Sequence, residues 1–227
     1  MEEVLLFDAF VKPEVIPHNV SYGIFASILL IIVAIAVKGS LRLVPRGLQN
    51  FVELIVEQIL KLTDETIGHH WSRSFFPFIC TIFLFILVCN LMSLVPGFAA
   101  ATANVNTNAA MAIPVFLFYQ FLGFRVHGLS YLNHFLGPIR SLSGLPLMIL
   151  MFPIELIGHF VRPLTLTVRL FGNMTGKHIL LLVLGIIAPA IVPSIILGLG
   201  VLVSVVQALV FTLLTICYFA GAVEEAH

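Results

Sequence analysis

Very few charged residues interrupt the last two thirds of the chain, and this feature constrains the fold more than any other. The 150 residues from Ser74 to Val223 include six charged side chains, of which Glu155 is the only carboxylate. Hydrophobic residues make up 60% of the 227 residues and charged residues 10%, whereas soluble domains are about 25% charged. Because so few charges cannot cover a surface in water, the sequence predicts an all-α, polytopic membrane protein, with residues 1–227 forming a single integral membrane domain.

Apolar segments of membrane-spanning length predict where the helices lie. A membrane helix needs about 20 apolar residues to cross about 30 Å of hydrocarbon. Such segments occur at residues 20–38, 75–95 and 109–124, and two longer ones follow at residues 145–188 and 194–222. We therefore expect about five membrane-embedded helices.

The two longer segments exceed the thickness of a bilayer. At about 1.5 Å per residue, the first is about 65 Å long and the second about 43 Å, and a usual tilt of about 20° does not absorb this excess. Either the helices break, for instance at Pro153 or Pro163, or they form a long, steeply inclined hairpin. We favour the inclined hairpin.

Residues 47–68 have an amphipathic pattern instead. Charged side chains such as Glu57, Lys61 and Asp64 alternate there with apolar side chains such as Ile55 and Ile59. Because this segment has too many charges to span a bilayer, we expect a helix that lies at the membrane surface or against a partner.

Basic residues predict the sidedness of the chain. They cluster after the first span, before the second and after the third, and the positive-inside rule places such loops in the cytoplasm. The N-terminus and the loop Phe98–Asn108, which has no Lys or Arg, then lie outside the cell. The hairpin returns the C-terminus to the cytoplasm.

Polar residues of the segment 145–188 gather on one side of a helix. At 100° per residue, six of them fall within a sector of about 80°, and the opposite side is apolar. We expect this stripe to line water or the polar site of another protein rather than lipid. Its members are Glu155, His159, Arg162, Arg169, Asn173 and Lys177.

Arg169 is the most informative residue of this stripe. An arginine at the centre of a membrane helix costs about 2.5–3.5 kcal/mol on insertion scales, and its guanidinium does not lose its proton. The nearest acid in sequence, Glu155, lies about four helical turns away. Two interpretations remain: Arg169 snorkels or pairs within the chain, or it is a fixed positive charge that meets a carboxylate of another chain. Gln207 offers an amide that could face Arg169 across the hairpin.

Other ligand classes find no support in the sequence. The 11 basic residues are balanced by 11 acidic ones, so a basic footprint for nucleic acid is missing. Gly172–His178 departs from a nucleotide-binding P-loop in its spacing and lacks the Ser or Thr. Cys80, Cys89 and Cys217 match no metal-site spacing and are interpreted as buried, inert thiols. We therefore expect no metal, cofactor, nucleotide or nucleic acid.

At Arg169-Leu170-Phe171-Gly172-Asn173-Met174 the sequence resembles the a subunit of the F-type rotary ATP synthase membrane sector, in its bacterial form. The similarity continues in Gln207–Leu214, Asn90–Pro96 and Thr102–Asn106, in the order that the family has them. It extends from the first span to the end of the chain.

The resemblance implies a function and its partners. In this family the a subunit stands beside a ring of c subunits, each with an essential carboxylate, and two aqueous half-channels reach the interface from opposite sides. Arg169 matches the arginine that attracts each deprotonated ring carboxylate and blocks a direct ion path. The implied function is ion translocation coupled to rotation and ATP synthesis, with no catalytic chemistry in this chain. We expect the ion to be a proton, and a sodium ion is the alternative. The implied partners are the c ring, the b-subunit peripheral stalk and the rest of the complex, in the inner membrane of a bacterium.

Further positions acquire roles from the same resemblance. Asn173 and Gln207 match polar positions near the arginine. Glu155 matches an acid assigned to the cytoplasmic half-channel, and Arg162 lies half-way between it and the arginine. Asn104 falls where some members have an Asp near the outer entrance.

One pair of the family is broken in this chain. His178 matches a position that is Glu or His, and its usual His or Glu partner across the hairpin is replaced here by Gly200. We hypothesise that Lys177 uses the room left by Gly200, and that Lys177 and His178 together tune the outer half-channel.

Two other functions agree less well with the sequence. A stand-alone ion transporter needs counter-charges within its own chain, whereas the segment from Glu155 to Lys177 has one acid against four groups drawn from Arg, Lys and His. A membrane metalloprotease needs a complete set of metal ligands, whereas Glu155-x-x-x-His159 lacks a third one.

Overall fold

The structure, a computed structural model, describes residues 17–39, 41–95, 98, 101–128, 145–187 and 191–223. Within these residues there is no strand, so the prediction of an all-α fold is confirmed. Four of the described helices are long and apolar enough to cross a membrane: α1, α3, α4 and the Ile195–Val223 part of α7. The elements are α1 (His18–Gly39), α2 (Leu48–Ile67), α3 (His69–Met92), the 3-10 helix η1 (Ala101–Ala103), α4 (Val105–His127), α6 (Leu145–Ile187) and α7 (Ile191–Val223).

Two helices begin earlier than their apolar segments do. Helix α3 begins at His69, directly after Gly68, whose φ of +87° suits a glycine and turns the chain from α2 into α3. Helix α4 begins at Val105 because the Asn104 side chain accepts a hydrogen bond of 2.8 Å from the backbone N–H of Asn106 and caps the helix. The predicted starts at residues 75 and 109 were therefore too late, since hydropathy marks only the apolar part of each helix.

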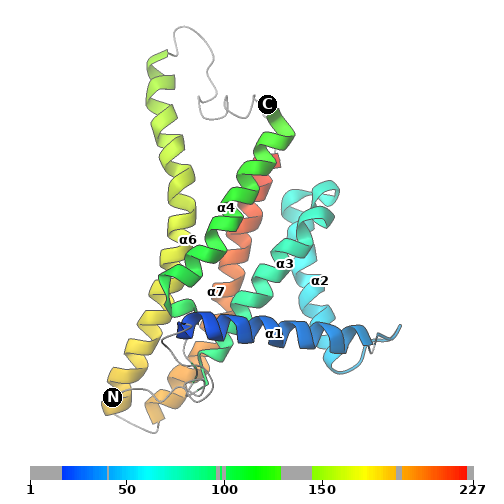
Figure 1. Cartoon of the computed structure of the whole chain (residues 1–227), viewed down its shortest axis with the longest axis vertical. Helices are drawn as coiled ribbons and strands as arrows, with labels where there is room; N and C mark the ends of the chain where they lie inside the picture. Colours follow the sequence, from blue (N-terminus) through cyan, green and yellow to red (C-terminus); the bar gives the residue numbers. More distant parts are fainter. Residues whose placement is uncertain are drawn as a thin grey trace.

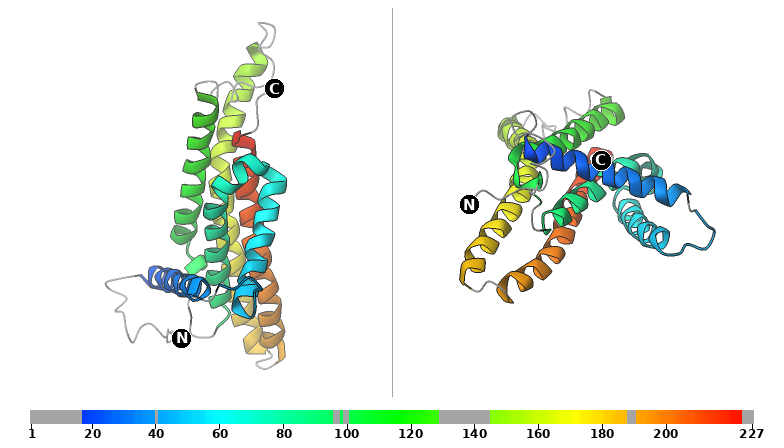
Figure 2. Two further views of the ribbon diagram at one scale, coloured as in Figure 1. Left: turned by 90° about the vertical axis from the view of Figure 1, so that its right-hand side faces the viewer. Right: turned by 60° about the horizontal axis from the view of Figure 1, so that its bottom comes forward.

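Helix α1 lies across the direction of the other long helices. In Figure 1, α4, α6 and α7 run along the long axis of the molecule and α1 runs across it, and the left view of Figure 2 shows the same relation after a 90° turn. Only Tyr22 and Ala26 of α1 are buried, and the Tyr22 ring packs on Phe98 with centroids 5.6 Å apart. Helices that cross one another cannot all lie parallel to the membrane normal. If α1 lies along the normal, α4, α6 and α7 must therefore be inclined to it.

Helices α6 and α7 are long and continuous. Helix α6 has 43 residues, about 65 Å, and runs through Pro153 and Pro163 without a break, while α7 has 33 residues. The alternative that the helix breaks at a proline is therefore wrong. Pro163 has no N–H to donate to the carbonyl of His159, four residues earlier.

Helix α2 packs its apolar side on the chain's own bundle. It lies against α3 and α7, with Ile59 fully buried and Ile55 beside the core. Glu57 and Lys61, on the other side, are exposed. Helix α2 thus agrees with the amphipathic helix predicted at residues 47–68, with the bundle itself as the partner of its apolar side.

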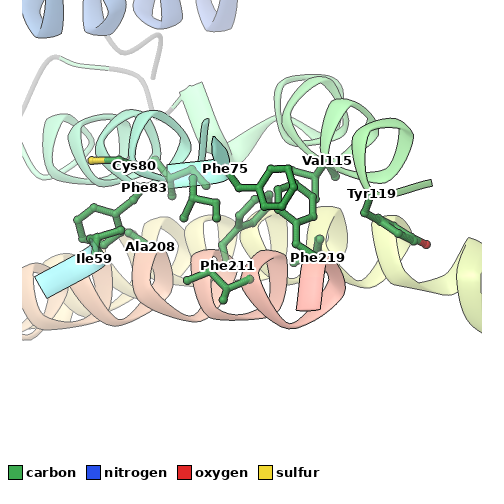
Figure 3. Packing of buried hydrophobic residues seen from close by; sticks show 14 of the residues in the cluster. Ile59, Phe75, Cys80, Phe83, Val115, Tyr119, Ala208, Phe211 and Phe219 are labelled. Atoms are coloured by element: carbon green, nitrogen blue, oxygen red, sulfur yellow. The ribbon is translucent and has the colours of Figure 1, made fainter. Parts of the chain in front are cut away.

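Large apolar side chains fill the space where α3, α4 and α7 meet. Figure 3 shows Phe75, Val115 and Phe219 pointing into this core, and the rings of Phe75 and Phe219 lie 5.5 Å apart. Packing of this kind, rather than exclusion from water, holds helices together in a bilayer. Cys80 and Cys89 are buried as predicted, but Cys217 is exposed on α7, because an apolar sequence does not reveal which side of a helix faces the bundle.

Candidate functional site

Arg169 lies on the side of α6 that faces away from the bundle. Helix α6 packs inward with Leu166, Leu170 and Met174, which are almost completely buried and recur every four residues along one side. Arg169 itself is exposed. Among the described residues, no ion pair includes its guanidinium. The interpretation of an arginine paired within the chain thus finds no support in the part of the molecule that the structure describes.

Small and polar residues surround Arg169 on this outer side. Thr165, Gly172, Asn173 and Gly176 are all exposed there. A methyl group added at Gly172 or Gly176 would meet no neighbouring atom within 4 Å. Small residues on a membrane helix allow a second helix to approach closely, so this side of α6 has room for a partner next to the guanidinium.

Gln207 contacts Asn173 across the two long helices. The Nδ2 group of Asn173 donates a hydrogen bond to Oε1 of Gln207, one helical turn beyond Arg169. Gln207 is buried, and its Nε2 has no partner among the described residues. The amide of Gln207 thus bonds to Asn173, four residues after Arg169 on α6.

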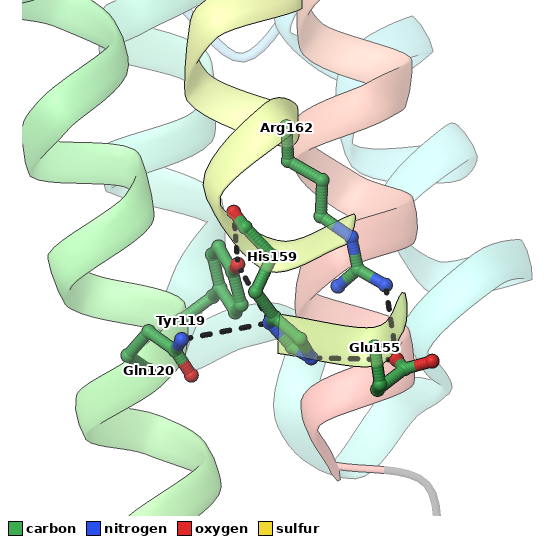
Figure 4. A network of polar contacts seen from close by, with 5 residues as sticks. All are labelled: Tyr119, Gln120, Glu155, His159 and Arg162. Atoms are coloured by element: carbon green, nitrogen blue, oxygen red, sulfur yellow. Dashed lines mark hydrogen bonds and ion pairs between the residues drawn. The ribbon is translucent and has the colours of Figure 1, made fainter. Parts of the chain in front are cut away.

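A group of polar residues surrounds Glu155 near the beginning of α6, and we call it the Glu155 cluster. Figure 4 shows its residues from α4 and α6 pointing toward one another. His159 lies at its centre: its Nδ1 is 2.9 Å from the Tyr119 hydroxyl and its Nε2 is 3.5 Å from Oε1 of Glu155. The cluster comprises Tyr119, Gln120, Glu155, His159 and Arg162.

Arg162 connects this cluster to α7. Its Nη2 atom lies 3.9 Å from Oε1 of Glu155. Its guanidinium also lies over two aromatic rings, 5.8 Å from the centroid of Tyr119 and 5.3 Å from that of Tyr218. Contacts of this kind are attractive because the face of an aromatic ring is negative. The positive charge of Arg162 is therefore compensated within the chain, whereas no ion pair of Arg169 occurs among the residues that the structure describes.

A second polar group, the Lys177 cluster, lies near the other end of α6. Lys177 is buried, and its Nζ donates to Oγ of Ser93 over 2.7 Å. Oγ of Ser93 in turn donates to the backbone carbonyl of Asn90. None of the described members of this cluster is an acid. They are Asn90, Ser93, Thr102, Asn108, Lys177 and Ser204.

Amides and hydroxyls hold the Lys177 cluster together across five elements: α3, η1, α4, α6 and α7. Thr102 donates to Oδ1 of Asn90 over 2.9 Å, and Nδ2 of Asn108 donates to the carbonyl of Thr102 over 2.8 Å. Two buried atoms, Nδ2 of Asn90 and Oδ1 of Asn108, have no partner among the described residues. Buried polar atoms of proteins are rarely left unbonded, so this pair of amides is suited to bind ordered water.

Gly200 is in close contact with Lys177. A Cβ atom at this position would lie 3.5 Å from Cδ of Lys177 and 2.6 Å from a methyl group of Leu94. The missing side chain thus leaves the space along which the stem of Lys177 passes. His178, the next residue, is half-buried, and Asn104 caps α4 through its contact with Asn106.

The two clusters lie on either side of Arg169 along α6. Fourteen residues separate Glu155 from Arg169 and eight separate Arg169 from Lys177, which correspond to about 21 Å and 12 Å of helix. Each cluster includes buried polar groups, and the exposed arginine lies between them. Among the described residues, no group of His, Cys, Asp and Glu side chains is arranged to hold a metal ion.

Comparison with known proteins identifies the family. The model of the family described as ATP synthase A chain matches residues 20–220. The chain belongs to the ATP synthase A chain family. It is 48% identical over 200 residues to ATP synthase subunit a of Trichlorobacter lovleyi, covering 88% of this chain and 84% of that protein. It is 43% identical over 235 residues to ATP synthase subunit a of Geobacter sulfurreducens, covering 100% of both.

Membership of the ATP synthase A chain family confirms the resemblance drawn from the Arg169–Met174 motif. Another relative, ATP synthase subunit a 1 of Syntrophotalea carbinolica, is 47% identical over 209 residues, which are 92% of this chain and 87% of that protein. The relatives are bacterial, and four helices are suited to cross a membrane. The chain is therefore a multi-pass protein of a bacterial inner membrane.

Sequence reasoning missed several residues of the two clusters. Tyr119 was not among the expected site residues. The sequence also did not predict that Asn108 and Thr102 belong to one polar group. The contact of Tyr119 with His159 joins residues 40 positions apart, and that of Thr102 with Asn90 joins residues 12 positions apart, which no local pattern reveals. A signal was nevertheless present in α4, because Tyr119 and Gln120 interrupt an otherwise apolar stretch.

Proposed function

We propose that this chain is the ion-translocating stator subunit of an F-type ATP synthase and works as one integral membrane domain. The observation that supports this best is Arg169, an exposed guanidinium on an apolar helix with no described carboxylate as its partner. A fixed charge in this place is costly unless an opposite charge from elsewhere meets it. In the proposed complex, a carboxylate of each c subunit is that opposite charge.

Arg169 then separates two ion paths. A guanidinium remains charged at any working pH, so it attracts each ring carboxylate that arrives without its proton. The same charge repels a proton that would otherwise pass directly from one path to the other. One elementary charge crossing the membrane releases about 2.3 kcal/mol per 100 mV, and this free energy drives the rotation that is coupled to ATP synthesis.

The two polar clusters supply the two half-channels. We assign the Glu155 cluster, with Arg162, to the cytoplasmic half-channel. The Lys177 cluster belongs to the outer half-channel, together with Asn104 and His178. Its unpartnered amide atoms on Asn90 and Asn108 are suited to hold water in that path. Asn173 and Gln207 lie beside the arginine, where the two paths approach the ring.

The partners follow from this arrangement. The side of α6 around Arg169, where the exposed residues are small, is the contact surface for the c ring. The b-subunit peripheral stalk holds the chain against rotation. The exposed apolar residues of α1 face lipid, and the predicted sidedness places the N-terminus outside and the C-terminus in the cytoplasm. Both termini lie outside the described residues. The chain has no catalytic chemistry, cofactor or nucleotide of its own.

Replacement of Arg169 tests this function. The variant Arg169→Ala, in the complete synthase of inverted membrane vesicles, is expected to abolish ATP-driven proton pumping while the complex still assembles. The matched control is Arg73→Ala, an exposed arginine at the beginning of α3, which leaves pumping intact. Pumping retained by Arg169→Ala would contradict the proposal.

A further inference from the structure

The two basic side chains that contact Glu155 both lie near the same oxygen atom of its carboxyl group. Nε2 of His159 lies 3.5 Å and Nη2 of Arg162 lies 3.9 Å from Oε1 of Glu155. The second oxygen points away from the cluster (Figure 4), and the side chain of Glu155 is 37% exposed. One oxygen of the carboxyl group is therefore held, and the other is open toward the surface of the chain.

The opposite side of the His159 ring is held by Tyr119. The Tyr119 hydroxyl lies 2.9 Å from Nδ1 of His159 and 3.5 Å from the backbone carbonyl of the same residue. Pro163, four residues later, has no N–H to donate to that carbonyl. Both Tyr119 and His159 are almost completely buried. The Tyr119 hydroxyl of α4 thus contacts the backbone carbonyl and the imidazole of His159 at the same place.

The donors and acceptors of this chain of contacts determine which ring nitrogen has the proton. If the Tyr119 hydroxyl donates to Nδ1, the single proton of a neutral imidazole is on Nε2, where it points at Glu155. Gln120 of α4 lies 3.5 Å from Nδ1, and Tyr218 of α7 reaches the cluster through Arg162. Nδ1 lies within hydrogen-bond distance of the Tyr119 hydroxyl, and Nε2 meets Glu155 at an ion-pair distance rather than in a hydrogen bond.

We propose that His159 is a positioning residue that holds the carboxyl group of Glu155 for proton exchange, and that Tyr119 holds His159 in turn. This inference rests on the proposed function, in which Glu155 belongs to the cytoplasmic half-channel. The held oxygen lies 3.5 Å from Nε2 of His159 and 3.9 Å from Nη2 of Arg162, and it remains an acceptor whether the carboxyl group is charged or neutral, because a neutral carboxyl group keeps a carbonyl oxygen. The open oxygen gains and loses the proton while the orientation of the group is preserved.

Three variants in the complete synthase test this role. His159→Leu removes both ring contacts, and ATP-driven pumping is expected to fall on the order of tenfold, because a small misplacement of a reacting group slows a reaction by a factor of this size or more. His159→Gln keeps a donor for Glu155 and an acceptor for Tyr119 but never becomes charged, so it is expected to restore most of the rate. Tyr119→Phe removes only the hydroxyl and is expected to lie between them.

The measurement is the pumping rate of inverted vesicles as a function of pH on the cytoplasmic side, with the amount of assembled complex determined by immunoblot. The control is Tyr22→Phe, which removes the hydroxyl of a buried tyrosine outside both clusters and leaves the rate unchanged. We expect His159→Gln to follow the pH profile of the unaltered protein and His159→Leu to depart from it.

Two results would overturn the inference. If His159→Gln loses as much activity as His159→Leu, the ring acts by taking up a proton itself and not by positioning. If His159→Leu pumps like the unaltered protein, the residue has no role in the path. Both results are separate from a failure of the proposed function, because that failure appears as pumping by Arg169→Ala.

Discussion

The two polar clusters on either side of Arg169 differ in how their positive charges are balanced. In the Glu155 cluster, the guanidinium of Arg162 lies near a carboxylate and over two aromatic rings. In the Lys177 cluster, the ammonium group donates to the hydroxyl of Ser93, and the described neighbours are amides and hydroxyls. The Glu155 cluster thus contains a counter-charge for its cation. The Lys177 cluster surrounds its cation with the dipoles of hydroxyl and amide groups instead.

This difference predicts what each cluster tolerates. Removing a cation that is paired with a carboxylate leaves an uncompensated negative charge. Removing a cation that is surrounded by hydroxyls and amides leaves only dipoles, which water satisfies. The Lys177 cluster is therefore expected to depend on its amide framework, and the Glu155 cluster on its charges.

The largest effect is expected from the amide framework of the Lys177 cluster. Asn90→Leu removes the acceptor of the buried Thr102 hydroxyl and leaves it unbonded, which costs about 2–3 kcal/mol of stability. The measurement is the temperature at which the detergent-solubilised complex loses this chain. Asn106→Leu, an exposed position at the start of α4, is the matched control. If the two variants were equally stable, the amide framework would not be what stabilises the Lys177 cluster.

A smaller effect is expected from the charge of the Glu155 cluster. Arg162→Met keeps an apolar stem but loses the contacts with Tyr119, Tyr218 and Glu155, so stability falls by about 1–2 kcal/mol and proton pumping slows. The same thermal assay and the vesicle assay measure the two effects. Arg73→Met is the control. If Arg162→Met were as stable as its control, the balance of charge in this cluster would not matter to the fold.

The smallest effect on stability is expected from Lys177→Met. A buried ammonium group can be replaced by an apolar group of similar size at a cost within about 1 kcal/mol, so the complex remains assembled. We expect its function to change instead: the ratio of ATP synthesis rates at alkaline and neutral pH shifts, because the charged group of the outer half-channel is missing. Lys61→Met, on the exposed side of α2, is the control. An unchanged ratio speaks against a tuning role of Lys177.

Much of the fold was predictable because apolar runs mark helices in a membrane protein. The two long helices, the amphipathic helix and the outward polar residue Arg169 all follow from hydrophobic patterns in the sequence. The early starts of α3 and α4 did not follow, because Gly68 and the cap formed by Asn104 act through backbone geometry. Hydropathy does not detect such signals.

The partners of the site residues were harder to predict than the residues themselves. Glu155, His159 and Arg162 share one side of α6 and were found by their spacing. Tyr119 lies 40 residues from His159, and its contact depends on how α4 packs on α6. Pro163 was expected as a possible break, whereas α6 continues through it.

The polar stripe of α6 also has a consequence for how the chain enters the bilayer. Helices α1, α3, α4 and α7 are apolar enough to insert one by one, whereas α6 has Glu155, Arg162, Arg169 and Lys177 along its length, and charged side chains disfavour insertion. Its neighbours are α4, made before it, and α7, made after it. We therefore expect α6 to remain at the membrane surface or in the insertion machinery until α7 is synthesised, and a chain truncated before residue 191 to leave α6 accessible to protease.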